Sequence, residues 1–193
     1  PDAESEADSA QIALVKQAID ALNQKYGAHF YLFVRPRTYN ARTRKYMPWE
    51  RKRGATLEMM RWLRGKESGI HMAAGGDAER LHAVRYLLVL DSDTQPGIDT
   101  VRELVSAALH PINRPIVDAH GVVQEGHGIL QPKIITDLAA ANKSWFSKVF
   151  AGQGGFEPYA TLCSDLYFDL SGEGTYTGKG LIDVDAYLTC LDH

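Results

Sequence analysis

The sequence is poor in cysteine and has no long apolar run, and both features narrow the class of protein. Only two cysteines occur, Cys163 and Cys190, and their spacing matches no metal-binding pattern. We expect both to be reduced thiols, as in a cytosolic protein. No stretch of 18 apolar residues and no signal peptide is present, so we expect these residues to be soluble and none of them to span a membrane.

A strong net charge and internal repeats are also missing. The formal net charge of -3, with both signs mixed, argues against a nucleic-acid partner. The 193 residues contain 45% apolar and 23% charged side chains, which is typical of a soluble globular protein and predicts one domain over 1–193. We expect residues 1–9 to be a flexible lead-in and the Gly- and Ala-rich residues 68–79 to be a mobile surface loop.

The most informative stretch is an uncharged apolar run at 86–90 that is followed by Asp91 and Asp93. Such a run predicts a strand buried on both faces of a mostly parallel sheet, and open α/β sheets bind ligands at the carboxyl ends of their strands. Two carboxylates one residue apart can share a hard cation such as Mg²⁺ or Mn²⁺. The alternative is that the two aspartates cap the turn or the helix that follows.

Basic residues are concentrated between 35 and 53, where Glu50 is the only acidic residue. Guanidinium and ammonium groups at the ends of strands and the starts of helices are suited to binding a diphosphate. The alternative interpretation is a solvated basic face.

A glycine-rich segment at 172–180 surrounds Glu173 and Lys179. Glycine lets the backbone approach a ligand closely and adopt positive φ, but the spacing is not that of a P-loop. A plain cluster of β-turns is the alternative. We expect a helix at 181–191, with Asp183 and Asp185 in or capping its first turn.

The remaining periodicities predict an α/β fold. They indicate helices at 10–26, 56–63, 100–109 and 143–150, and strands at 29–34, 115–117 and 128–135. Pro132 places the last of these strands at a sheet edge or a bend.

Seven segments together resemble the glycosyltransferase domain of cyclic β-1,2-glucan synthases. They are RPR (35–37), ERKRG (50–54), LLVLDSDTQ (87–95), GILQP (128–132), SWFSKVFAG (144–152), DLSGEGTYTGKG (169–180) and DVDAY (183–187). The resemblance extends from residue 30 to residue 187, and several of the matching segments are long.

The resemblance implies a GT-A-like, Rossmann-like, mostly parallel sheet flanked by helices and incomplete at both ends. It also implies an inverting transferase that moves glucose from UDP-glucose to a growing β-1,2-glucan acceptor, with Mg²⁺ or Mn²⁺ as cofactor. It places the metal at Asp91 and Asp93, the donor at Arg35, Arg37, Arg51, Lys52, Arg53, Gly54 and Asp91, and the sugar and acceptor at Gly172, Glu173, Gly174, Gly178, Lys179 and Gly180.

The resemblance further implies that the chain belongs to a larger multidomain protein at the cytoplasmic face of the bacterial inner membrane. In such enzymes the general base is an aspartate in a later motif, so we expect it beyond His193 and expect this segment alone to be inactive. Two alternatives stay open. One is a non-catalytic carbohydrate-binding or assembly module of the same fold, and the other is a hydrolase that pairs Glu173 with an aspartate.

Overall fold

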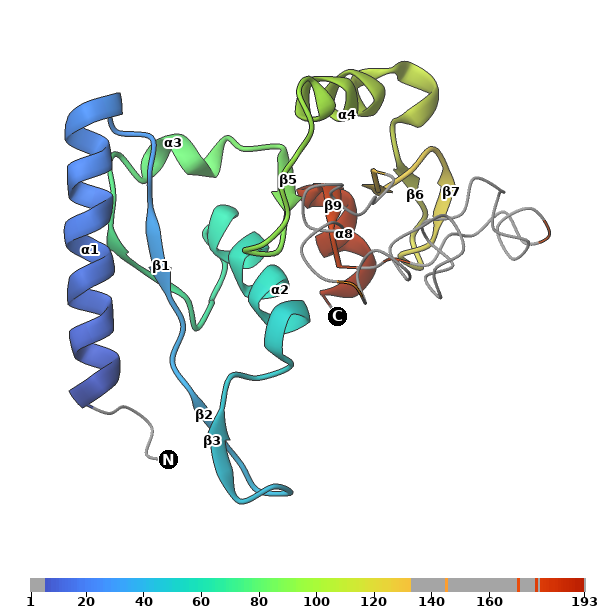
Figure 1. The fold of residues 1–193 in the computed structure, drawn as a ribbon. Coiled ribbons are helices and arrows are strands. Elements are labelled where there is room, and N and C mark those ends of the chain that lie inside the picture. The colour runs from blue at the N-terminus through green and yellow to red at the C-terminus, as the bar shows by residue number, and fades with distance from the viewer. Residues whose placement is uncertain (1–5, 133–144, 146–169, 171–175, 177, 193) are drawn as a thin grey trace.

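The computed structural model describes residues 6–132, 145, 170, 176 and 178–192 and shows a mixed α/β protein (Figure 1). Its elements are α1 (Glu6–Tyr26), β1 (Leu32–Val34), β2 (Thr38–Asn40), β3 (Lys45–Met47), α2 (Arg51–Leu63), β4 (His71–Ala74), α3 (Glu79–His82), β5 (Tyr86–Val89), α4 (Thr100–Leu109), the 3-10 helix η1 (Pro111–Asn113), β6 (Ile116–Val117), β7 (Val123–Glu125), β8 (Ile129–Leu130), β9 (Gly180–Asp183) and α8 (Val184–Leu191). None of the described helices is long and apolar enough to cross a bilayer.

The strands form four small sheets, and every strand pair in the described part of the chain is antiparallel. Strands β1 and β4, β2 and β3, and β6 and β7 form two-stranded sheets. Strands β5, β9 and β8 form a three-stranded sheet in that order. The predicted mixture of helices and strands is confirmed, but the prediction of a mostly parallel sheet is wrong for these residues.

Strand β5 is the apolar run on which the parallel sheet was predicted. All four of its residues are only partly buried, because β5 lies at one edge of the three-stranded sheet. The central strand is β9, and all four of its residues are buried. An apolar run indicates that a strand is buried, but it does not indicate the direction of the neighbouring strand. The neighbour of β5 is β9, which lies far along the chain.

The hydrophobic core lies where α2 and α8 pack on the three-stranded sheet. Its buried members are Met60, Leu63, Ile182, Val184, Tyr187 and Leu188. Helix α2 was predicted from residue 56 but begins at Arg51, so its first turn extends beyond the apolar residues that carry the helical period. In Figure 1, α2 and α8 lie near the middle of the molecule, and α1 lies at one side beside β1.

Helix α1 covers the two-stranded sheet of β1 and β4. It begins earlier than predicted and includes residues 6–9, which were expected to be a loose lead-in, and it ends before Gly27, which has φ 90°. The Asn23 side chain bridges to the next segment, since its amide donates to the Phe30 carbonyl and its oxygen accepts from the Phe30 N–H, both at 2.9 Å. Residues 68–79, expected to be a loop, contain strand β4.

The segment 181–191, predicted to be one helix, divides into the end of β9 and helix α8. Its first residues complete the sheet by pairing with β5, and this non-local pairing overrides the helical pattern. Asp183 caps α8 as expected, with its carboxylate accepting from the Ala186 N–H at 3.0 Å. Helix α4 has the predicted bounds, and β8 is the outermost described strand of its sheet, as Pro132 indicated.

Some expectations cannot be compared with the fold. The helix expected at 143–150, apart from residue 145, lies outside the described residues, as do Cys163, Gly172, Glu173 and Gly174. Cys190 is a free thiol, and burial raises its pKa.

Candidate functional site

Three charged side chains from separate parts of the chain meet at the end of β5. Because β5 and β9 are antiparallel, with Val89 opposite Gly180, the loop after β5 lies beside the turn before β9. The Lys179 ammonium lies 3.1 Å from Oδ2 of Asp91. The ammonium of Lys52, in the first turn of α2, donates to the other oxygen, Oδ1. We call Lys52, Asp91 and Lys179 the lysine–aspartate cluster.

The cluster is open to solvent. Lys52 and Asp91 each keep 39% of the side chain exposed, and Lys179 keeps 23%. The hydrogen bond from Lys52 lowers the pKa of Asp91 most, and the hydrogen bond from Lys179 lowers it further, against an opposing effect of burial. Asp91 is therefore a carboxylate at neutral pH, and the cluster carries two positive charges and one negative charge within reach of a ligand.

The lowered pKa gives a first testable prediction. We expect Lys52→Met and Lys179→Met each to raise the pKa of Asp91 toward the ordinary value of about 3.9, with the larger effect from Lys52, because each substitution removes an ammonium that stabilises the carboxylate. Carbon-13 NMR of the Asp91 carboxyl group measures this. In the wild type, the Lys52–Asp91 and Lys179–Asp91 pairs stabilise the fold at pH values above the pKa that Asp91 has in the unfolded chain. This contribution to stability is lost as the pH falls through the lower pKa that Asp91 has in the folded protein.

The control for that titration is Lys45→Met, which removes an exposed lysine on β3. We expect it to leave the pKa of Asp91 unchanged. An Asp91 pKa that is the same in all three variants would contradict the pairing described above.

Gly178 and Gly180, both predicted to border a ligand, differ in their surroundings. Gly178 has φ 84°, as expected for such a turn, and a β-carbon placed there would lie 3.8 Å from the Lys52 ammonium. At Gly180 a β-carbon would lie 2.8 Å from the Leu130 carbonyl oxygen. Close packing of β8 on β9 therefore accounts for Gly180, whereas at Gly178 a β-carbon would only make ordinary contact with Lys52 among the described residues.

Sequence reasoning missed Tyr176, which interacts electrostatically with Asp91, and Tyr187, a buried core residue that interacts with Tyr176. Burial raises the pKa of Tyr176, and the neighbouring Tyr187 and the negative charge of Asp91 raise it further. Burial also raises the pKa of Tyr187. Both hydroxyl groups therefore stay protonated and can donate hydrogen bonds. The sequence feature that could have indicated Tyr176 is its position as an aromatic residue inside the glycine-rich segment, two residues before Gly178.

Most of the predicted basic donor residues are engaged elsewhere. Arg35 donates to Glu58 at 2.5 Å, to the Arg51 carbonyl at 2.8 Å and to the Trp49 carbonyl. Its guanidinium holds the chain before α2 against the helix.

Arg37 and Arg53 also have carboxylate partners. Arg37 forms a bidentate pair with Asp8 at 2.6 and 2.8 Å. Arg53 pairs with Glu50, and 76% of its side chain is exposed. Lys52 is the one member of the predicted basic set that contacts Asp91 in the described part of the chain.

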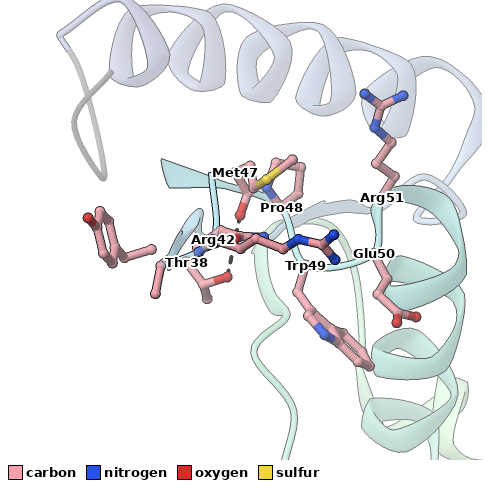
Figure 2. A pocket seen from close by; sticks show the side chains of 10 residues that line it. Thr38, Arg42, Met47, Pro48, Trp49, Glu50 and Arg51 are labelled. Atoms are coloured by element: carbon pink, nitrogen blue, oxygen red, sulfur yellow. Dashed lines mark hydrogen bonds between the residues drawn. The ribbon is translucent and has the colours of Figure 1, made fainter. Parts of the chain in front are cut away.

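Arg51 lines an open pocket of about 810 Å³ between the β2–β3 hairpin and the start of α2 (Figure 2). The lining residues are Thr38, Tyr39, Asn40, Ala41, Arg42, Met47, Pro48, Trp49, Glu50 and Arg51. None of them belongs to the lysine–aspartate cluster, so this hollow and the charged cluster are separate features.

The two aspartates of the predicted metal pair have different surroundings. Asp93 is exposed and forms no hydrogen bond or ion pair with any described residue, whereas both oxygens of Asp91 accept from lysine. The described residues contain no group of three or more His, Cys, Asp or Glu side chains that could hold a metal. Mg²⁺ commonly uses one or two carboxylates together with substrate phosphates. A divalent cation at Asp91 would therefore need ligands beyond the described protein groups, such as phosphate oxygens.

Fold and site together define a class. The described residues form a mixed α/β protein in which two ammonium groups surround one carboxylate at the end of one sheet, and ammonium groups are common ligands of phosphate.

Comparison with known proteins shows a protein with a similar sequence. No protein family model matches the chain. The chain is 37% identical over 199 residues to the cyclic β-(1,2)-glucan synthase NdvB of Rhizobium meliloti (strain 1021). The match takes 97% of this chain and 7% of the synthase, so the chain is related to a small segment of that protein.

Proposed function

We propose that this chain is the donor-binding part of an inverting glucosyltransferase domain. The donor is UDP-glucose, the acceptor is a growing β-1,2-glucan, and the fold is of the GT-A type. The sequence relationship to a cyclic β-(1,2)-glucan synthase supports the reaction class. The lysine–aspartate cluster at the end of β5 is the structural observation that carries the proposal, because it offers charges of both signs where a nucleotide diphosphate and a cation would meet.

Within this proposal the residues act by electrostatics. Transfer of the glucosyl group leaves negative charge on the departing UDP, and the Lys52 and Lys179 ammonium groups stabilise that charge. A divalent cation, Mg²⁺ or Mn²⁺, would be held by Asp91 and Asp93 and would add Lewis-acid stabilisation of the diphosphate. An inverting transferase also needs a general base that deprotonates the acceptor hydroxyl, and we do not assign this role to any of the described carboxylates.

The proposal extends to the protein that contains this segment. We infer a larger multidomain enzyme at the cytoplasmic face of a bacterial inner membrane, with the catalytic base contributed elsewhere. A binding experiment on this chain is therefore a more direct test than an activity assay.

Calorimetric titration of UDP-glucose in the presence of Mn²⁺ tests the donor site. We expect binding by the wild type and a loss of affinity of about tenfold or more in Asp91→Asn and Asp93→Asn, because each substitution removes a charged metal ligand. The matched control is Asp99→Asn, which removes an exposed carboxylate in the same segment that pairs with Arg102. We expect no change in affinity for this variant.

Two outcomes would contradict the proposal. The first is a wild-type chain that does not bind UDP-glucose with Mn²⁺. The second is affinity for β-1,2-glucan that needs no metal and is unchanged in Asp91→Asn, which would favour a non-catalytic carbohydrate-binding module.

A further inference from the structure

The two oxygens of Asp91 are unusual for a metal ligand because each already accepts from an ammonium group. Lys52 reaches Oδ1 from α2, and Lys179 reaches Oδ2 from the turn before β9. A divalent cation that approached Asp91 alone would have to share the carboxylate with the two lysines or displace one of them, and it would lie next to two positive charges. Like charges at such distances repel, so this arrangement disfavours the cation by itself.

The same two lysines are the groups that a diphosphate would attract. An ammonium is a flexible point charge on a four-carbon stem and can move from a carboxylate oxygen to a nearby phosphate oxygen. Both lysines are partly exposed, and Gly178, which has no side chain, lies beside Lys52. The cluster therefore has the solvent access that such an exchange requires.

We propose that Asp91 and the diphosphate of the donor compete for Lys52 and Lys179, so that the cation binds Asp91 tightly only when a diphosphate has drawn the lysines away. Asp91 then has two opposite effects on diphosphate binding. Without metal it holds the lysines and weakens binding, and with metal it holds the cation and strengthens binding. The identity of the diphosphate as UDP-glucose rests on the proposed function, but the competition itself rests on the cluster.

Pyrophosphate is the probe for the first test. Calorimetry measures its affinity for the full chain in EDTA and as its Mn²⁺ complex, for the wild type, Asp91→Asn and the control Asp99→Asn. We expect Asp91→Asn to bind pyrophosphate about tenfold more tightly than the wild type in EDTA and about tenfold more weakly with Mn²⁺, a coupling of ordinary size. Asp99→Asn should match the wild type in both conditions. A variant at position 91 that binds more weakly, or equally, in EDTA overturns the proposal.

A second measurement does not depend on replacing Asp91. Electron paramagnetic resonance gives the affinity of the chain for Mn²⁺ alone, and we expect Lys52→Met and Lys179→Met to bind Mn²⁺ several-fold more tightly than the wild type and than Lys45→Met. Unchanged or weaker Mn²⁺ binding in both variants overturns the proposal.

The two proposals can fail separately. If pyrophosphate shows the reversal but UDP-glucose does not bind with Mn²⁺, the competition stands and the glucosyltransferase proposal fails. If UDP-glucose binds with Mn²⁺ but no reversal occurs, the competition is wrong and the donor site stands.

Discussion

Replacing Ile182 by alanine is expected to lower the free energy of unfolding by about 2 to 5 kcal/mol, the usual cost of deleting a buried aliphatic side chain. Ile182 is fully buried in the central strand β9, opposite Leu87 of β5 on one side and Ile129 of β8 on the other. The substitution removes apolar contacts to both neighbouring strands and leaves a cavity. Since a domain is typically stable by only about 5 to 15 kcal/mol, the loss would be a large fraction of the total.

Urea denaturation measures this effect through the midpoint, with the slope expected to stay the same. The control is Ile116→Ala on β6, where the residue is 54% exposed, and there we expect a loss of less than about 1 kcal/mol. A loss at Ile182 as small as that at Ile116 would mean that β9 is not the central strand of a packed core.

The position of Ile182 also shows where sequence reasoning reached its limit. Helix α4 could be predicted with its bounds because its period and its ends are local features. Residues 181–183 were predicted to be helical, because the sequence near them does not show that they pair with β5, which comes from a distant part of the chain. Strand direction is also decided by pairing with a strand that is distant in the sequence. The antiparallel sheet could therefore not be predicted from the apolar run at 86–90.

For the candidate site, too, some features could be predicted from the sequence and others depend on the fold. The sequence indicated Asp91 and Lys52 at the donor and Lys179 on the sugar and acceptor side, and the structure brings these three together. It did not indicate that Arg35 and Arg37 would be engaged by Glu58 and Asp8, because those carboxylates come from elements that only the fold brings alongside. A basic cluster in a sequence gives the charge of a region but not which cations remain free for a ligand.

The start of α2, which carries Lys52, depends on a glycine. Gly54 is buried, and a β-carbon placed there would overlap the Trp49 carbonyl oxygen and lie 2.6 Å from Nη2 of Arg35 and 2.8 Å from the Trp49 ring. Arg35 cannot move away freely, because Glu58 and the Arg51 carbonyl also hold its guanidinium. The glycine therefore serves the packing of the chain before α2 against the helix.

Helix propensity and packing make opposite predictions for Gly54→Ala. Alanine in a helix interior is more favourable than glycine by about 1 kcal/mol, whereas forcing an extra group into a packed site costs about 1 to 3 kcal/mol. The overlap includes a backbone oxygen that has little room to move, so we expect packing to dominate and the protein to lose about 1 to 2 kcal/mol. The control, Gly128→Ala, adds a β-carbon 3.7 Å from its nearest neighbour, and we expect it to be close to neutral.

Gly54→Ala should also disturb the lysine–aspartate cluster in the folded protein. Lys52 lies two residues earlier in the first turn of α2, so a shift of that turn would move its ammonium away from Asp91. We therefore expect the carboxyl carbon of Asp91 to titrate closer to its ordinary pKa in Gly54→Ala than in the wild type or in Gly128→Ala. If Gly54→Ala instead stabilised the protein by about 1 kcal/mol, as propensity alone predicts, and left Asp91 unchanged, the close packing of α2 against Trp49 and Arg35 would be refuted.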